Sequence, residues 1–469
     1  MQTAAVSIEN SHDDAFPEPL AARIAQAVVS LTPDELSAQV TEKVKTCLFD
    51  FIGCAFESTE LPWSLQAKHF LQPVAEGGAS VIGSSETTSY ADAAFANAVM
   101  GHGLVREDMH SGSVSHLGIV ILPTLLALSQ YRQVTGRDFI VSAAVGYEVG
   151  GRIGRAAMSP EIARIHRPTG ISGPLGAAAA GARLLGLDAG AATSAIALAT
   201  NTTLGFNQWA HTGGSEMFFQ AGFAARNALT AVRLAEAGAF ASPSALDGEA
   251  GLFASLGKRD AASSVTLFDA EPEILSVYHK PVPACNFAQT ACQAALAIAR
   301  ETKWEPEQIK SINVRVPRAG MLYPGCDATG PFAHVLQAKM SIQYNVAAAL
   351  IKGSVSEDNF ALLEDAQLLR LIGTITMEVD DEMTRAYPGK QGGEVEVVEF
   401  GGANHRVRLD DVLVATAADV RERFLKETTK ALGERRATKI EKFIDDIERH
   451  EDAGHLAAFL GSSANNNGD

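Results

Sequence analysis

The residues best suited to acid–base chemistry lie together in one segment, 105–118 (VREDMHSGSVSHLG). Asp108, His110 and His116 place a carboxylate beside two imidazoles, which are groups that can hold and move a proton near neutral pH. The small residues between the histidines suit a loop that folds tightly around a ligand. We therefore predict that His116 or His110 is the general acid/base and that Asp108 orients it. The alternative is a solvated polar loop without a catalytic role.

Four basic residues are candidates for holding an anion. Arg106 lies in the same segment, and a guanidinium can bind a carboxylate through two hydrogen bonds. His166 and Arg167 precede the start of an Ala-rich helix, where free N–H groups favour an anion. Lys280, in the sequence VYHKPVPAC, falls at a predicted domain junction, a common location of ligand sites. We predict that Arg106, His166 and Arg167 bind substrate, and that Lys280 acts with Arg167 on charge that develops during the reaction.

A Gly-rich turn supplies two further candidates for the pocket, Trp209 and His211. A metal site is not expected, because His110 and His116 do not have a standard zinc spacing. Asp108 with both histidines would make only a weak two-histidine, one-carboxylate pattern. The sequence GGRIG at 150–154 lies within helical periodicity and follows no strand, so it does not indicate a dinucleotide site.

The segments that must position these residues have a helical period before residue 270. The expected helices are Val40–Cys54, Asp92–Met100, Ile121–Tyr131, Asp138–Ala156, Gly173–Leu185, Ala191–Thr200, Ala221–Ala237 and Ser244–Ser255. An earlier helix start is expected at Thr32, followed by Pro33.

The pattern changes after residue 270. Alternating β-branched stretches predict strands, and Gly401–Asn404 predicts the turn of a hairpin. The expected strands are Ile309–Val316, Ile375–Val379, Glu394–Phe400 and Arg406–Leu409, with helices at Asn286–Thr302 and Val335–Ile351. The segment Ala417–His450 is again helical and is expected to pack on the first part. We predict a mainly α protein: a large all-α domain (18–271 with 411–460), a smaller α+β lid domain (272–410), and disordered tails (1–17 and 461–469).

Composition excludes several classes of protein. The chain has 469 residues and a formal net charge of −17, which argues against nucleic acid or an anionic membrane as the main partner. The five cysteines, an odd number without a CxxC motif, favour reduced thiols in a reducing compartment. The first twenty residues lack the apolar core of a signal peptide, and no apolar run has membrane length. We expect a cytoplasmic protein.

Six motifs occur in an order that resembles the MmgE/PrpD family over roughly residues 18 to 460. They are the segment Asp92–Gly118, GYEV at 146–149, PTGISGPLGAAAAGARLLGL at 168–187, GFAARN at 222–227, KPVPAC at 280–285 and AKMSIQYNVAAAL at 338–350. Members of this family include 2-methylcitrate dehydratase and cis-aconitate decarboxylase. The resemblance implies a large helical domain, an α+β lid, a homodimer, and a site between the domains that needs no cofactor. It also implies dehydration, decarboxylation or epimerisation of small di- or tricarboxylates.

Some family residues carry over and others do not. His116 matches the loop histidine of the family, Asp108 one of its loop aspartates, and Lys280 the lysine of its KPYPxC motif. Three positions that carry ionisable residues in the family differ here. Arg106 stands where an aspartate is usual, Arg167 where a histidine is usual, and Met217 where a lysine is usual. In addition, His110 replaces a small residue or threonine. These departures indicate a rearranged carboxylate pocket or a different substrate.

The resulting hypothesis is a cofactor-independent lyase or isomerase that moves a proton next to a carboxylate. Two other classes stay open at this point. One is a metal-assisted hydratase that uses Asp108, His110 and His116. The other is a non-catalytic carboxylate-binding protein that has kept only the fold.

Overall fold

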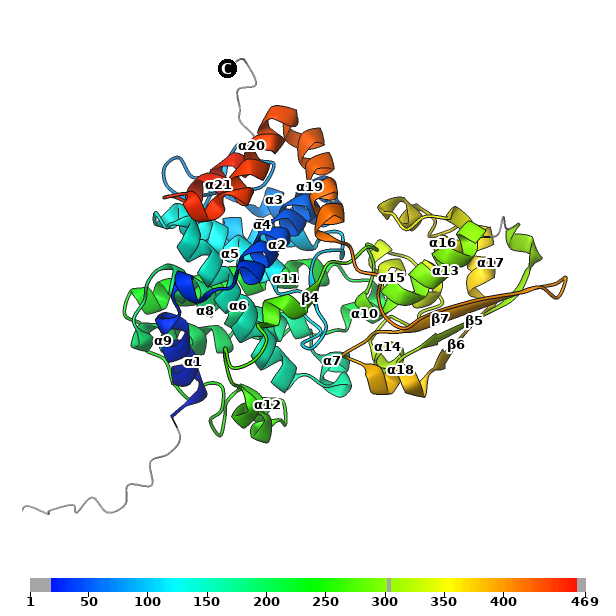
Figure 1. Cartoon of the computed structure of the whole chain (residues 1–469), viewed down its shortest axis with the longest axis horizontal. Coiled ribbons are helices and arrows are strands. Elements are labelled where there is room, and N and C mark those ends of the chain that lie inside the picture. Colours follow the sequence, from blue (N-terminus) through cyan, green and yellow to red (C-terminus); the bar gives the residue numbers. More distant parts are fainter. Residues whose placement is uncertain (1–17, 302–304, 462–469) are drawn as a thin grey trace, which may run out of the picture.

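The computed structural model describes residues 18–301 and 305–461, and its architecture is mainly α, as predicted. Figure 1 shows a large helical body and a smaller lobe that contains a sheet. Of the tails predicted at 1–17 and 461–469, residues 1–17 and 462–469 lie outside the described residues. Among the described residues, no helix is long and apolar enough to cross a membrane.

The helical body is built around two almost wholly buried helices, α5 (Gly118–Tyr131) and α8 (Pro168–Leu184). Helices α4 (Tyr90–His102), α6 (Gly136–Ala157) and α11 (Glu216–Glu236) pack around them. A side chain at Gly176 would collide with the backbone of α6 at Gly146, so glycine permits the close approach of α6 and α8. The Ala- and Gly-rich sequence is thus a requirement of helices that pack backbone to backbone.

Further elements complete the body. They are α1 (Leu20–Ser30), α2 (Ala38–Glu57), α3 (Pro62–Phe70), α7 (Pro160–Ile165), α9 (Ala189–Thr200), α10 (Trp209–Thr212), α12 (Leu252–Ser255), β1 (Ala79–Ser80) and β2 (Thr87–Thr88). A two-stranded ribbon, β3 (Met109–His110) with β4 (Val277–Tyr278), joins the segment of predicted catalytic residues to the junction segment. This pairing fixes the loop on both sides of His110.

The smaller lobe contains a four-stranded sheet in the order β6–β5–β7–β8. Strands β5 (Ile309–Val316) and β6 (Ile375–Val379) are parallel, whereas β7 (Gly393–Glu399) and β8 (Asn404–Leu409) form the predicted hairpin. The helices of this lobe are α13 (Gln289–Glu301), α14 (Arg318–Leu322), α15 (Val335–Met340), α16 (Ile342–Lys352), α17 (Ala366–Ile372) and α18 (Asp381–Ala386). Helix α13 packs on β7, β8 and α16 and forms the core of the lobe.

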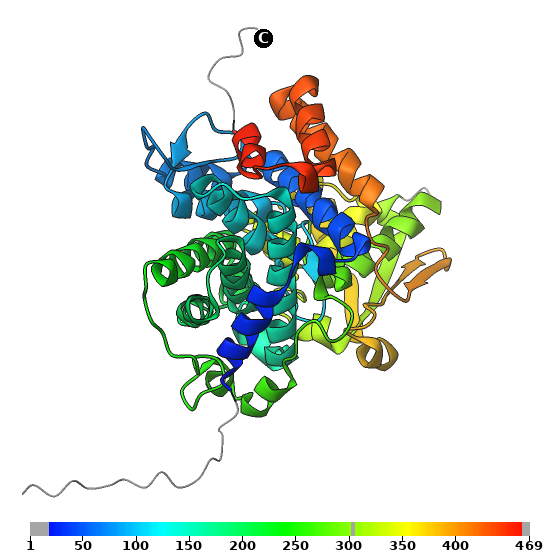
Figure 2. The same ribbon diagram turned by 60° about the vertical axis from the view of Figure 1, so that its left-hand side comes forward.

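The last helices, α19 (Ala417–Leu432), α20 (Glu434–Asp445) and α21 (Gly454–Leu460), return to the helical body. Helix α19 packs along α2 and α21 packs on α5, as the orange and red helices in Figures 1 and 2 show. The Asp50 carboxylate of α2 is bound by His279 Nδ1 at 2.9 Å and by Arg423 of α19 at 3.3 Å. The domain boundaries at 272–410 remain a prediction.

Four helix predictions differ from the structure in their limits. The segment 244–251 is a turn, so α12 holds only the end of the predicted helix. Ser341 divides α15 from α16, and its hydroxyl accepts the Tyr344 N–H as an N-cap. Gly433, at φ 84°, separates α19 from α20. Pro33 begins a 3-10 turn closed by a capping box, and α2 starts only at Ala38.

Candidate active site

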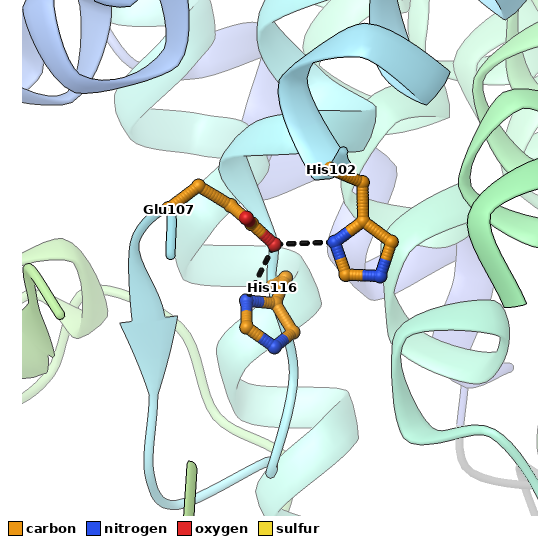
Figure 3. A group of neighbouring side chains, drawn as sticks. All are labelled: His102, Glu107 and His116. Carbon is orange, nitrogen blue, oxygen red and sulfur yellow. Dashed lines mark hydrogen bonds and ion pairs between the residues drawn. The ribbon is translucent and has the colours of Figure 1, made fainter. Parts of the chain in front are cut away.

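Three buried side chains converge where α4 ends and α5 begins (Figure 3). His102 is the last residue of α4, Glu107 lies in the following loop, and His116 lies two residues before α5. Glu107 Oε1 accepts hydrogen bonds from Nδ1 of both histidines, with a His116 distance of 2.9 Å. The two rings are therefore held in fixed orientations by one carboxylate oxygen.

The loop between His102 and Glu107 has an unusual backbone. Val105 has φ 57°, a left-handed conformation that is an outlier for a β-branched residue. Two buried lysines hold this backbone: Lys280 Nζ donates to the Val105 carbonyl, and Lys339 Nζ donates to the Leu104 carbonyl at 3.1 Å. Such strain persists only where surrounding contacts enforce it, and it is frequent at functional sites.

His116 is arranged as a base. Its Nδ1 lies 3.0 Å from the Asp108 backbone carbonyl and 2.9 Å from Glu107 Oε1, so Nδ1 carries the proton in the neutral ring. Figure 3 shows Nε2 on the far side of the ring from Glu107, and no residue of the described chain hydrogen-bonds it. Burial lowers the pKa of His116 to about 4, despite the opposing effect of Glu107. The neutral ring thus has an available lone pair near pH 7.

Arg167 supplies a positive charge in the same place. Its guanidinium donates to His102 Nε2 at 2.8 Å and to the Tyr323 hydroxyl at 3.2 Å. A guanidinium has five N–H donors, so donors remain for a ligand. Trp209 lies under this group, with its ring centroid 5.4 Å from the guanidinium carbon, and therefore supports Arg167 without lining the cavity.

A narrow inner cavity brings His116 and Arg167 together. Its volume is about 20 Å³, and it lies between the helical body and the smaller lobe. The lining residues are Val105, Met109, Val114, His116, Arg167, Met217, Cys285, Asn286, Phe287, Tyr323 and Met340. Val114, Phe287 and Tyr323 also line a larger outer chamber, so these three side chains lie where the two spaces adjoin.

Lys280 is fully buried next to this cavity. Burial lowers its pKa to about 8, while Glu107 opposes this shift. The ammonium group is therefore mostly charged at pH 7. Its ammonium group donates a hydrogen bond to the Val105 carbonyl, so it acts on the site through the local potential and through the loop backbone.

Asp108 lies beside the site, with its carboxylate turned away from His116. Its Oδ1 accepts the Gly118 N–H at 3.2 Å, at the start of α5, and its Oδ2 accepts the Tyr147 hydroxyl. Burial raises the pKa of Asp108 to about 7. The predicted contact between Asp108 and His116 is thus made by the backbone of Asp108, and the orienting carboxylate belongs to Glu107.

Of the predicted site residues, His116 and Arg167 line the inner cavity, and besides Asp108, Lys280 and Trp209 four others do not. His110 is bonded at both ring nitrogens, to Ser113 and Glu273. Arg106 donates to Glu57, with an NH1–Oε1 distance of 3.2 Å. The remaining two are His166, which is half-buried beside Phe206, and His211, which is exposed on α10.

The sequence interpretation missed His102, Tyr323 and Cys285, and it placed Glu107 in the loop without a role. His102 lies at the end of an Ala-rich helix, and a lone histidine there carries no pattern that separates it from a core residue. Glu107 and Asp108 are adjacent carboxylates, so only the backbone direction at Val105 decides which one meets the histidines.

His102, Glu107 and His116 are also the one group of described residues whose ligand atoms could hold a metal ion, lying within 4.8 Å of one another. This set differs from the predicted alternative of Asp108, His110 and His116. In this structure both Nδ1 atoms are engaged with Glu107. Burial is the largest cause that lowers the pKa of His102, and the charges of Arg167 and Lys280 add to this effect. The field of these two cations also opposes a dication.

Comparison with known proteins gives the class of the chain. The MmgE/PrpD N-terminal domain model matches residues 22–264, and the MmgE/PrpD C-terminal domain model matches residues 282–449. The chain belongs to the MmgE/PrpD family, and the predicted enzyme class, a lyase of the dehydratase or decarboxylase type, is confirmed.

Several relatives are cis-aconitate decarboxylases or similar proteins. The cis-aconitate decarboxylase-like protein oryM of Aspergillus oryzae is 27% identical over 484 residues, which cover 95% of this chain and 98% of that protein. Human cis-aconitate decarboxylase is 23% identical over 462 residues, covering 93% of each chain. Cis-aconitate decarboxylase of Aspergillus terreus is 32% identical over 219 residues, covering 45% of this chain and 44% of that protein.

Proposed function

We propose that this protein is a cofactor-independent lyase that moves a proton at a carbon next to a carboxylate of a small di- or tricarboxylate. The observation that carries the proposal is the shared cavity of His116 and Arg167, in which His116 Nε2 is free of protein partners in the described chain. A neutral imidazole beside a guanidinium can exchange a proton with a substrate whose carboxylate is held in place.

The proposed chemistry uses these groups in separate roles. Arg167 binds the substrate carboxylate, and Tyr323, whose oxygen accepts from Arg167, is free to donate its O–H to the same group. In dehydration, His116 removes the proton beside the carboxylate, and the electron pair expels the hydroxyl group on the next carbon. In decarboxylation, carbon dioxide leaves first, and the protonated His116 then gives a proton to the same carbon.

The charge that develops on the carbon spreads into the adjacent carboxylate as an enolate. Arg167 and the buried Lys280 stabilise this charge, and preorganised cations in a low-dielectric site are effective in this role. Glu107 fixes the orientation of His116 and stabilises its protonated form. A substrate carboxylate near the ring raises the pKa of His116 further in the complex, which allows it to act as an acid.

Proton exchange in deuterium oxide, followed by NMR, tests the proposal. The substrates are cis-aconitate, methylcitrate, citrate, itaconate and substituted succinates. We expect deuterium incorporation or conversion with at least one of them and none with His116→Gln. Release of carbon dioxide or of a new alkene distinguishes decarboxylation from dehydration. Binding without exchange across the panel would favour a non-catalytic carboxylate-binding protein.

A metal-assisted hydratase is a second candidate, supported by the grouping of His102, Glu107 and His116. Metal analysis of the purified protein and assays with a chelator separate the two. A stoichiometric metal and activity lost to the chelator would replace the cofactor-independent mechanism.

We further propose that the protein is a cytoplasmic homodimer, as the family resemblance implies. Exposed aromatic residues such as Phe70, Phe206 and Phe223 offer apolar surface for such an interface. Light scattering coupled to size-exclusion chromatography gives the mass in solution, and a monomeric mass would contradict the dimer.

A further inference from the structure

We propose that the substrate carries an apolar substituent several carbons long, and that this substituent lies in the outer chamber while the carboxylate head lies in the inner cavity. The inference rests on the proposed function, because it names the substrate class of the same site. Three features of the described chain support it: the few charges of the inner cavity, the apolar walls of the outer chamber, and the side chains that the two spaces share.

The inner cavity is poorly suited to three carboxylates. Arg167 is the one cationic side chain among its described lining residues. Most of the wall is apolar, formed by Val105, Met109, Val114, Met217, Phe287 and Met340. A second or third carboxylate against this wall would lose its hydration without a partner, which is costly.

Met217 is an apolar residue at a position where the family usually has a lysine. Its sulfur lies 2.8 Å from His102 Nε2 and 3.4 Å from an Arg167 nitrogen, inside the catalytic cluster. A cationic side chain here would add a second carboxylate contact. With methionine, the site offers a soft apolar surface, which tolerates alkyl groups of varied shape.

The outer chamber continues this apolar surface towards solvent. It shares Val114, Phe287 and Tyr323 with the inner cavity, and its volume is about 390 Å³. Its remaining walls include Met158 and Ala163 of the body and Ala319, Tyr387 and Pro388 of the smaller lobe. A chain attached to a carboxylate head at Arg167 would therefore leave the inner cavity between two apolar walls.

The polar groups of the outer chamber do not form a second anion site. Arg155 is engaged by Glu273, with distances of 3.2 and 2.7 Å to its two carboxylate oxygens. Arg318 is exposed to solvent. Because the charge of Arg155 is already paired, an apolar occupant fits this chamber better than a second acidic group.

The first experiment measures binding and needs no turnover. Isothermal titration of the full chain with methylsuccinate, butylsuccinate and hexylsuccinate gives dissociation constants for one head group and three chain lengths. Burial of each methylene predicts binding about threefold tighter per carbon, at least up to butyl. A dissociation constant that is flat or rises with chain length would overturn the inference.

The second experiment blocks the outer chamber. Ala319→Trp should weaken hexylsuccinate at least tenfold while methylsuccinate stays within about twofold. Ala458→Trp, on an exposed position of α21, is the matched control and should change neither constant. If Ala319→Trp lowers the melting temperature strongly, Ala319→Leu serves with a smaller expected effect. Equal weakening of both ligands by the chamber variant would contradict the assignment.

The two proposals fail in different ways. Turnover of cis-aconitate together with a flat chain-length series would uphold the lyase and overturn the apolar substituent. Tight binding of hexylsuccinate without turnover of any substrate would uphold the chamber and contradict the lyase.

Discussion

Two buried histidine–carboxylate clusters lie on either side of one short loop, and they differ in a single respect. In the inner cluster, His116 is held by Glu107 at Nδ1, and its Nε2 reaches the cavity. In the outer cluster, His110 is bonded to Ser113 through Nδ1 at 2.7 Å and to Glu273 through Nε2 at 2.6 Å. Both rings are buried, and burial lowers the pKa of both.

The difference teaches how to separate a catalytic histidine from a structural one in this loop. Burial, a carboxylate partner and a lowered pKa are common to both clusters. Only His116 has a ring nitrogen that the described protein leaves for a ligand. His110 instead fastens the loop to Glu273, which Arg155 also binds at 2.7 Å.

The largest expected effect comes from replacing the two histidines that the comparison separates. His116→Gln should lower kcat at least about a thousandfold, as loss of a general acid/base does, with a small change in melting temperature. His110→Gln is the matched variant: kcat should stay within tenfold, while the free energy of unfolding falls by about 1–3 kcal/mol, because the buried Glu273 loses a partner. Steady-state kinetics and thermal melts of both variants test this. The reverse pattern would exchange the roles of the two histidines.

The next effect concerns the carboxylate partners. Glu107→Gln should lower kcat about a hundredfold, since His116 loses the anion that stabilises its protonated form. The pKa of His116 should also fall, so the acid limb of the pH profile should move to lower pH. Glu273→Gln should leave the acid limb in place. A shift of the limb in the Glu273 variant would show that the clusters are coupled.

The pH dependence of kcat/KM in the unaltered protein sharpens the comparison further. In the dehydration route His116 is active in its neutral form, so dehydration activity should rise with pH through about 4. Lys280 stabilises charge only when protonated, so activity should fall as pH rises through about 8. Lys280→Met should lower activity and remove the upper limb. An unchanged upper limb in this variant would assign that limb to another group.

The smallest expected effect belongs to Asp108. Its pKa is raised from the ordinary value of 3.8 to about 7, so the folded state binds more protons than the unfolded state between these values. Its contribution to stability is complete at low pH and is lost as pH rises to about 7. Asp108→Asn should flatten this dependence in urea titrations at pH 5 and pH 7.5, with kcat within tenfold. A larger kcat loss would place the carboxylate in the chemistry.

Much of this arrangement follows from sequence patterns. The periodicity of apolar residues predicted the principal helices, and alternating residues around a Gly-rich turn predicted the hairpin of β7 and β8. Residue type and position singled out His116 and Arg167, which the fold brings to one cavity. The periodicity of apolar residues predicts these elements because burial of an apolar face depends on many residues. The prediction therefore tolerates small errors in where a helix or strand begins and ends.

Other features depend on the conformation of single residues or on one strand pairing. The hydrophobic periodicity of the sequence does not predict these. The left-handed Val105 decides that Glu107, and not Asp108, meets the histidines. The pairing of β3 with β4 sets His110 opposite Val277 and near Glu273. Met217 was recognised as an unusual residue, yet its contact with His102 needs the packing of α11 on α4.

The return of α19 to the helical body has a consequence for how the protein is made on the ribosome. Arg423 of α19 binds the Asp50 carboxylate and also donates to the Lys280 carbonyl at 2.9 Å. Asp50 emerges early in synthesis, whereas Arg423 emerges after nearly all of the cavity wall. Until then, Asp50 lacks its guanidinium partner and the backbone of Lys280 is not yet anchored. The last helices thus act as the closing step of folding, and a nascent chain cannot hold a finished site before they arrive.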